Sequence, residues 1–125
     1  VVMAAAPADY TPVSTFANKV KTDSLTLSLK KTEDIAAAVG REKQEGTRLV
    51  IFSAETECLL ENARGKLERK NADLVVANDV TQEGAGFNTD TNIVTLIDKK
   101  GEVIPLEKMP KIEVADAILN KLKTL

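Results

Sequence analysis

The chain has 125 residues, with 17 basic and 19 acidic side chains and a formal net charge of -2. This length favours a single domain with a core of its own. The near balance of charges gives no electrostatic reason to expect a nucleic-acid partner. The sequence contains no histidine and one cysteine, which excludes Ser-His-Asp and Cys-His catalysis and makes a zinc site unexpected. Any chemistry must therefore rest on lysines, carboxylates, amides and backbone groups.

The number of cysteines and the lengths of the apolar runs predict the cellular location of the protein. Cys58 has no second cysteine to pair with, which fits a reducing compartment. The apolar opening Val1–Tyr10 is too short for a signal peptide and no cationic segment precedes it. No run approaches the ~20 apolar residues of a membrane span. The sequence predicts a soluble, cytoplasmic protein with no membrane partner, and its abrupt start inside a strand pattern predicts that it is incomplete at the N-terminus.

The first third of the chain alternates strand and loop patterns. Val1–Ala6 is a short apolar run typical of a buried strand, and a loop follows it. Val13–Asp23 is polar and predicts a flexible flap. Leu25–Leu29 alternates apolar and polar residues, which predicts a strand with one face covered. Ile35–Lys43 is expected to be helical, with Asp34 as its N-cap.

The middle of the chain predicts a strand, a helix and a second strand. Arg48–Ser53 is a compact apolar strand, Glu55–Lys70 is a helix, and Asp73–Ala77 returns as a strand that is apolar on both faces. This order is typical of a right-handed parallel crossover with helices on both sides of the sheet. The apolar residues of the helix fall on one face: Leu59, Leu60, Ala63 and Leu67.

The last third predicts a hairpin and a helix. A polar loop over 79–92 leads to a strand over Ile93–Ile97, and the turn at Asp98–Gly101 returns the chain as Glu102–Leu106. Pro110 opens a final helix, whose apolar stripe is Val114, Ile118, Leu122 and Leu125. The whole pattern predicts one α/β domain over residues 1–125, a Rossmann-like three-layer fold with a mainly parallel sheet and a C-terminal hairpin.

Ligands of open parallel sheets bind beyond the carboxyl ends of the strands. Three polar segments leave strands in that direction and are expected to converge: Ala8-Asp9-Tyr10, Ser53-Ala54-Glu55-Thr56 and Asn78-Asp79-Val80. The Asp9 carboxylate is equally expected to cap a turn or to accept hydrogen bonds from ribose hydroxyls. The Asp79 carboxylate is expected to cap its turn.

Four lysines and the single cysteine each have two possible roles, one structural and one functional. Lys66 and Lys70 share one helix face, and either stabilise the helix dipole or reach the phosphates of a nucleotide. Lys19 and Lys21 are either solvated loop residues or phosphate contacts. Cys58 lies beside the apolar stripe of its helix and is expected to be a partly buried packing thiol rather than a nucleophile, because no base accompanies it.

Five segments, in order and spacing, resemble one family, the phosphopantothenate–cysteine ligases of coenzyme A biosynthesis. Ala5–Pro12 is similar to the family's AAVADYRP, Lys19–Lys21 to its KIKK flap, Phe52–Thr56 to FAAET, Arg69–Val80 to RKNLDLIVANDV, and Gly86–Asn92 to GFGSDTN. Pro7, Thr11 and Thr22 depart from these motifs at positions of no assigned role.

The resemblance implies a two-step ligation. CTP activates the carboxylate of 4'-phosphopantothenate as an acyl-cytidylate with help from Mg²⁺, and the amine of L-cysteine then displaces CMP. It further implies a homodimer, for which the edges at Leu25–Leu29 and at the hairpin near residue 100 are candidates. FMN is implied only if a decarboxylase domain precedes this chain.

The resemblance also assigns residues. By this resemblance, Lys19 is the catalytic lysine of the flap and contacts the phosphates of the nucleotide. The implied nucleotide-binding set is Ala5, Ala6, Asp9, Lys19, Asp34, Ile35, Phe52, Lys66 and Lys70. Asp34 and Ile35 fall where the family has NPDI, although Thr32 and Glu33 replace its Asn-Pro. No metal ligand is assigned.

One part of the family pattern has no counterpart in these 125 residues. The family's Gly-rich phosphate loop, and the asparagine that acts on the acyl intermediate, belong to an N-terminal half of the ligase domain. Two functions are therefore expected from different classes. The chain is either the C-terminal part of an active ligase, or a non-catalytic nucleotide-binding or dimerisation module that is inactive without that half.

Overall fold

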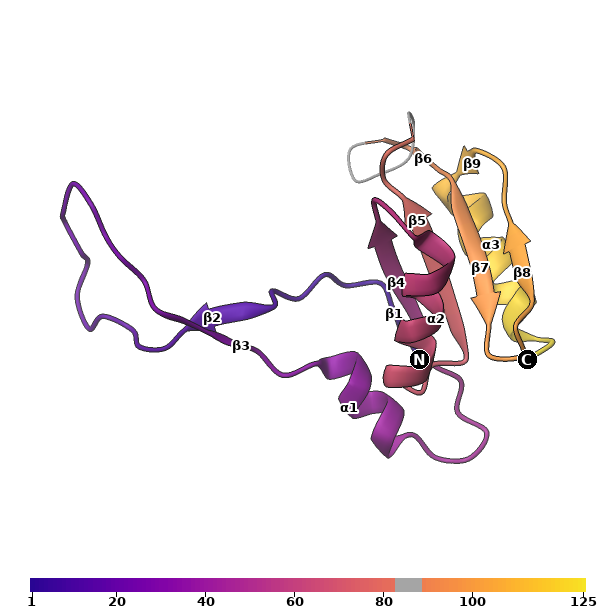
Figure 1. Ribbon diagram of the computed structural model, residues 1–125, viewed down its shortest axis with the longest axis horizontal. Coiled ribbons are helices and arrows are strands. Elements are labelled where there is room, and N and C mark those ends of the chain that lie inside the picture. Colours follow the sequence, from indigo (N-terminus) through magenta and orange to yellow (C-terminus); the bar gives the residue numbers. More distant parts are fainter. Residues whose placement is uncertain (83–88) are drawn as a thin grey trace.

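The computed structural model describes residues 1–82 and 89–125. Its centre is a five-stranded sheet in the order β1-β4-β5-β7-β8 (Figure 1). The strands are β1 (Val2–Met3), β4 (Val50–Glu55), β5 (Leu74–Asp79), β7 (Val94–Asp98) and β8 (Val103–Pro105). The first three are parallel to one another, and β7 and β8 form an antiparallel hairpin beside them. This confirms the predicted mainly parallel sheet with a C-terminal hairpin.

Helices cover both faces of the sheet, as the doubly apolar strands predict. Helices α1 (Ile35–Glu42) and α2 (Leu59–Arg69) lie over one face, and α3 (Lys111–Leu122) lies over the other (Figure 1). Along β5 the buried side chains alternate between these two layers. Val75 packs in the α1 and α2 core and Val76 in the α3 core, and both are fully buried. Each such side chain contributes roughly 1.5–3 kcal/mol of burial free energy.

The connection from β4 to α2 differs from the expected one. The strand continues through Glu55, which pairs with Asp79, so the helix begins four residues later, at Leu59. Cys58 stands at its N-cap with a positive φ of 49° and is exposed. The expectation of a packing thiol inside the helix was therefore wrong. Leu60 is also 43% exposed, so it does not belong to the buried face of the helix as predicted.

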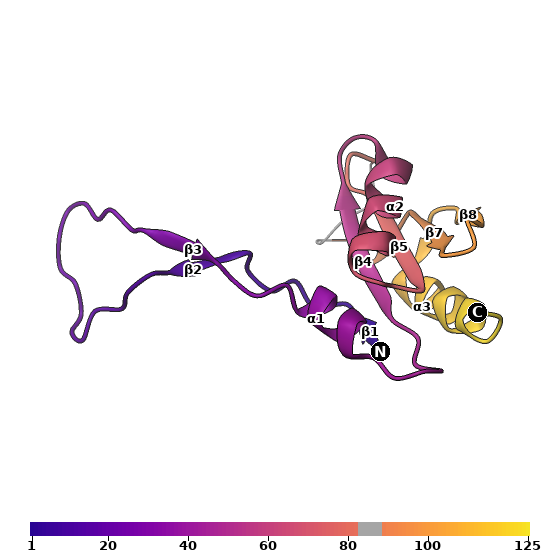
Figure 2. The same cartoon turned by 60° about the horizontal axis from the view of Figure 1, so that its bottom comes forward.

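A long hairpin arm leaves the domain between β1 and α1. Strands β2 (Tyr10–Pro12) and β3 (Leu29–Lys31) pair antiparallel near its base. The loop between them extends far from the sheet (Figures 1 and 2). The amide of Thr32 donates to the Asp9 carbonyl at 2.9 Å and closes the base.

The predicted strand over Leu25–Leu29 is wrong in two respects. The strand begins only at Leu29, and Leu25 and Leu29 are both about half exposed. The alternating pattern indicated a covered face, but no described part of this chain packs against the arm. The apolar side chains of the arm are exposed: Tyr10, Val13, Phe16, Val20, Leu25, Leu27 and Leu29.

The C-terminal elements follow the prediction. Short strands β6 (Thr91–Asn92) and β9 (Met109–Pro110) pair, and α3 starts directly after Pro110. Two residues of the predicted stripe are buried and two pack partly against the same core: Val114, Ile118, Leu122 and Leu125. Residues 83–88, which include the start of the Gly86–Asn92 segment, lie outside the described residues. Among the described helices, none combines the length and the hydropathy needed to cross a bilayer.

Candidate functional site

A pocket of about 710 Å³ lies where the chain leaves β1, beside the base of the arm and the carboxyl ends of β4 and β5. Seven separate parts of the chain line it, and they include residues from all three segments that were expected to converge. Seven of the nine expected nucleotide-binding residues are among its walls: Ala5, Ala6, Asp9, Asp34, Ile35, Phe52 and Lys70. The strand ends therefore converge on one pocket, as expected, and bring together residues that are distant in sequence.

The wall nearest the arm is the N-terminus of α1. The carboxylate of Asp34 accepts from the Ala37 amide at 3.0 Å, so it caps the helix as predicted. Lys70 Nζ lies 3.3 Å from the same oxygen. The Ala37 amide, with Lys70 adding to it, lowers the pKa of Asp34 from its usual value. A lysine and a helix N-terminus thus stand together at the pocket wall, an arrangement that favours anions.

An aromatic ring forms part of another wall. Side chains of β4 alternate between the two faces of the sheet, so Phe52 lies on the α3 side with Val50, and Ser53 lies on the α2 side. Val50 is fully covered, whereas Phe52 is 40% exposed to the pocket. An open phenyl face of this kind can pack against the flat ring of a ligand.

Lys66 points elsewhere. Its ammonium donates to the Ser53 hydroxyl at 2.6 Å and to Glu55 at 2.7 Å, and it does not line the pocket. Glu55 also accepts from Ser53 and from Asn62. Burial alone would raise the pKa of Glu55, but the hydrogen bonds from Lys66 and Ser53 outweigh it and lower that pKa. Lys66 is thus a neutralised neighbour of Ser53, which does line the pocket, whereas Lys70 reaches the pocket itself.

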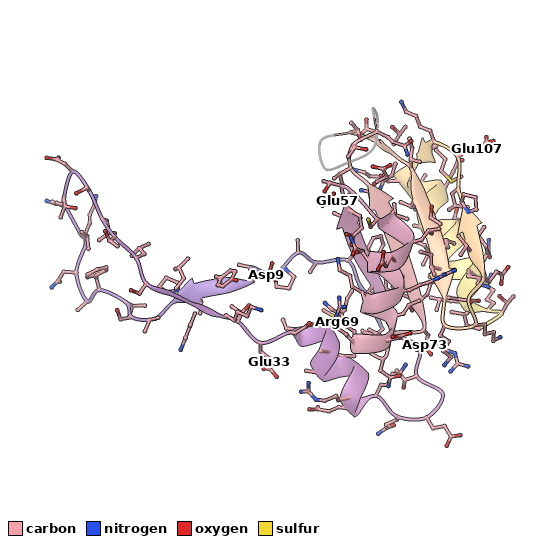
Figure 3. All side chains as sticks on the ribbon, viewed as in Figure 1. Asp9, Glu33, Glu57, Arg69, Asp73 and Glu107 are labelled. Atoms are coloured by element: carbon pink, nitrogen blue, oxygen red, sulfur yellow. The ribbon has the colours of Figure 1, made fainter. Side chains whose placement is uncertain are left out.

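Lys19 and Lys21 lie on the outer part of the arm, exposed and outside the pocket lining. Figure 3 places Asp9 at the arm's base, on the side toward Glu33 and Arg69. The arm therefore separates the two kinds of predicted residue. Asp9 belongs to the pocket of its own chain, and Lys19 is carried away from it.

The two residues at the end of β5, Asn78 and Asp79, have different roles. Asp79 caps its turn as expected: its carboxylate accepts from the amide and the hydroxyl of Thr81 at 3.0 and 2.6 Å. The Thr81 hydrogen bonds lower the pKa of Asp79. Asn78 instead lines the pocket. Its side-chain oxygen is buried and has no hydrogen-bond partner among the residues that the structure describes.

Two further pocket residues had no role assigned from the sequence. Asn92 comes from β6 and Lys111 is the first residue of α3. The signal for Lys111 was Pro110, which starts a helix, but nothing in the sequence indicated that this start lies beside the ends of β4 and β5. Pairing of β6 with β9 brings it there.

The acidic residues of the pocket wall do not form a metal cluster. Within residues 1–82 and 89–125, no group of three or more cysteine or carboxylate side chains is arranged to hold a metal ion. Mg²⁺ is often bound by substrate phosphates with only one or two protein carboxylates. Three carboxylate residues line the pocket: Asp9, Glu33 and Asp34.

Comparison with known proteins places the chain in one family. The family model for the DNA/pantothenate metabolism flavoprotein C-terminal domain matches residues 1–125. The Coenzyme A biosynthesis bifunctional protein CoaBC of Bacillus subtilis (strain 168) is 46% identical over 127 residues, covering 100% of this chain and 31% of that protein. A cysteine/cysteine sulfinic acid decarboxylase from an unknown prokaryotic organism is 43% identical over 126 residues, covering 99% of this chain and 35% of that protein. The chain thus spans about a third of the length of these curated relatives.

Solved structures agree with the sequence matches. The crystal structure of the C-terminal domain of CoaBC superposes with a TM-score of 0.74 at 37% identity, covering 96% of this chain and 50% of that one. The DNA/pantothenate metabolism flavoprotein from Streptococcus pneumoniae gives a TM-score of 0.64 at 26% identity, covering 94% of this chain and 56% of that one. The chain belongs to the DNA/pantothenate metabolism flavoprotein C-terminal domain family.

Proposed function

We propose that this chain is the C-terminal, nucleotide-handling part of a CTP-dependent phosphopantothenate–cysteine ligase of coenzyme A biosynthesis. The observation that carries the proposal is the gathering of seven motif residues, from four separate segments, around one pocket. A fold that binds no nucleotide would not need Asp34, Lys70 and Phe52 to line the same pocket. The relatives named for coenzyme A biosynthesis support the same pathway.

The proposed reaction has two steps. A carboxylate oxygen of 4'-phosphopantothenate attacks the α-phosphorus of CTP, the bond to the leaving pyrophosphate breaks, and an acyl-cytidylate results. The amine of L-cysteine then forms a C–N bond with the acyl carbon, the C–O bond to CMP breaks, and the nitrogen releases its excess protons. Both steps bring anions together, so the protein must supply positive charge and orientation. Magnesium enters with CTP, and FMN would belong only to a separate decarboxylase domain.

Within this proposal the pocket holds the nucleotide between two walls. Lys70 and the N-terminus of α1 face the phosphates, and Phe52 packs against the base or the ribose. Asp9 accepts from the ribose hydroxyls, and Ala5 and Ala6 leave room for the nucleotide to approach the backbone. Lys66 does not contact the nucleotide; it holds the pocket residue Ser53 in place through a 2.6 Å hydrogen bond.

Changing Lys70 to Gln is expected to weaken CTP binding about tenfold, because one charge-assisted contact to phosphate is lost. Calorimetric titration of the natural full-length polypeptide with CTP measures this. Lys100→Gln is the matched control, since it removes the same charge at the β7–β8 turn. Equal affinities in the two variants would contradict the placement of the phosphates at Lys70.

The arm leads us to propose a homodimer. Seven apolar side chains of the arm are exposed, and an apolar surface of this extent usually marks an interface. Lys19 lies on this arm, away from the pocket of its own chain. We propose that the arm packs on a second copy and that Lys19 completes the phosphate site of that copy.

Lys19→Gln is expected to slow acyl-cytidylate formation about 100-fold, since a positive charge on the reacting phosphates is removed. Release of pyrophosphate from CTP and 4'-phosphopantothenate, measured without cysteine, reports this step. Asp23→Asn in the same arm is the control and should leave the rate unchanged. Mixing Lys19→Gln subunits with subunits that carry Lys70→Gln should restore part of the activity if the two residues act across a dimer. Normal turnover of Lys19→Gln would remove it from the mechanism.

A further inference from the structure

The α3 side of the pocket contains three polar side chains that the proposed nucleotide contacts do not use. Asn78 projects from β5 on the face of the sheet that α3 covers, because it follows Leu74 and Val76 at alternate positions. Asn92 precedes β7 by two residues, and Asn78 pairs with Val94 at the start of that strand. Lys111 follows Pro110, which pairs with Thr91. The strand register therefore brings Asn78, Asn92 and Lys111 to one corner, on the opposite face of the sheet from α1 and α2, whose ends carry Asp34 and Lys70.

Each of these three side chains offers a ligand a different group: an acceptor, a donor or a positive charge. The Asn78 side-chain oxygen is buried and has no partner among the described residues, so it requires a hydrogen-bond donor. Asn92 uses its oxygen to accept from the Ile93 amide at 3.0 Å, which leaves its NH₂ group as a donor. The Lys111 ammonium forms no ion pair within residues 1–82 and 89–125. It also stands at a helix N-terminus without a side-chain cap.

This corner therefore combines one buried acceptor with a cation and an amide donor. A phosphate satisfies Lys111 but brings only acceptors to the Asn78 oxygen. A sugar hydroxyl satisfies Asn78 but leaves the lysine unpaired. A small zwitterion satisfies both, because its ammonium donates to Asn78 and its carboxylate accepts from Lys111 and Asn92.

We propose that Asn78, Asn92 and Lys111 form the subsite for the amino-acid substrate, with Asn78 on the ammonium and Lys111 on the α-carboxylate of cysteine. This rests on the proposed function and deepens it. The subsite lies in the same pocket as the nucleotide walls, so an amine held by Asn78 faces the space where the acyl group is activated. Lys111 then distinguishes an amino acid from a simple amine.

Cysteine and cysteamine separate the role of Lys111 from a structural one. Cysteamine has the same amine and thiol but no carboxylate. In the natural full-length polypeptide, Lys111→Gln is expected to lower kcat/KM for cysteine about tenfold or more, through KM, and to leave kcat/KM for cysteamine unchanged. Lys100→Gln should change neither. An equal loss for both amines, or no loss for cysteine, would overturn the assignment.

Two variants of Asn78 test the other half of the subsite. Asn78→Ala removes the acceptor and should raise KM for both amines about tenfold, whereas Asn78→Asp retains an acceptor and should recover most of the affinity. A higher KM for CTP instead of cysteine in these variants would overturn the subsite. Pyrophosphate release without cysteine is measured in parallel. Its absence in the unmodified protein would refute the proposed ligase and the subsite with it. Normal release with an unchanged KM for cysteine would refute the subsite alone.

Discussion

Replacing Asp73 by alanine is expected to lower the free energy of unfolding by about 3–5 kcal/mol. Asp73 is fully buried immediately before β5, and Figure 3 marks it near the lower end of the central sheet. Its carboxylate accepts from Lys43 and Lys99, each at 2.5 Å, and from the Leu49 amide at 2.8 Å. It therefore connects the end of α1, the entry to β4 and the β7–β8 turn. Removing the carboxylate leaves the nearly buried ammonium of Lys43 without this ion pair and the buried amide of Leu49 without its acceptor.

The same site makes stability depend on pH in the acid range. Burial would raise the pKa of Asp73, but hydrogen bonds from Lys43, Lys99 and Leu49 lower it from 3.8 to about 2. A folded-state pKa below the unfolded value means that the contribution is complete above pH 4 and declines as the pH falls towards 2. The full difference is about 2 kcal/mol at 1.36 kcal/mol for each pH unit.

Urea unfolding at pH 7 and at several values between pH 4 and pH 2 measures both effects. Asp73→Asn keeps the shape and removes the charge, so its stability should change less over this range than that of the unmodified protein. Asp116→Ala, on the exposed face of α3, is the control and should lie within about 0.5 kcal/mol of the unmodified protein. A loss below 1 kcal/mol for Asp73→Ala would show that the three donors find other partners.

The second large effect is expected at Gly40, where alanine should destabilise the fold by about 3 kcal/mol or more. A Cβ atom at Gly40 would lie 1.8 Å from the Lys70 carbonyl oxygen and 2.8 Å from its carbon. The clash is with backbone, so α1 and the end of α2 would have to separate. The 2.8 Å hydrogen bond from the Asn71 side chain to the Gly40 carbonyl would weaken with them. Helix propensity alone predicts the opposite sign, since alanine is favoured over glycine by about 1 kcal/mol.

Gly65→Ala is the matched control for this prediction. Gly65 lies inside α2, and an added Cβ would meet only the end of the Arg69 side chain, at 2.9 Å. That flexible group can move, so the gain in helix propensity should remain and the variant should be stabilised by about 0.5–1 kcal/mol. Thermal unfolding followed by circular dichroism compares the two changes. If Gly40→Ala were also stabilised, the contact between α1 and α2 would have to be looser than the structure has it.

Local patterns predicted most of the fold correctly because they depend on neighbours in sequence. The doubly apolar run at β5 indicated a strand covered on both faces, and Asp34 indicated the start of α1. Patterns failed where a local preference was outweighed by pairing. At Glu55 strand pairing with β5 postponed the helix and left Cys58 exposed. The alternation at Leu25–Leu29 indicated a buried face, but its cover is absent from the described chain.

By itself, the sequence determined the strand–helix–strand crossover, the polar strand ends and the motif residues, since each is a property of a short segment. The tertiary structure alone decided which of those residues share a pocket. It separated Lys70 at the pocket wall from Lys66, which Glu55 neutralises 2.7 Å away, and it carried Lys19 outward on the arm. It also brought Asn78, Asn92 and Lys111 to one corner. The physical reason is that side-chain direction and strand register depend on partners far away in sequence, and no local pattern contains that information.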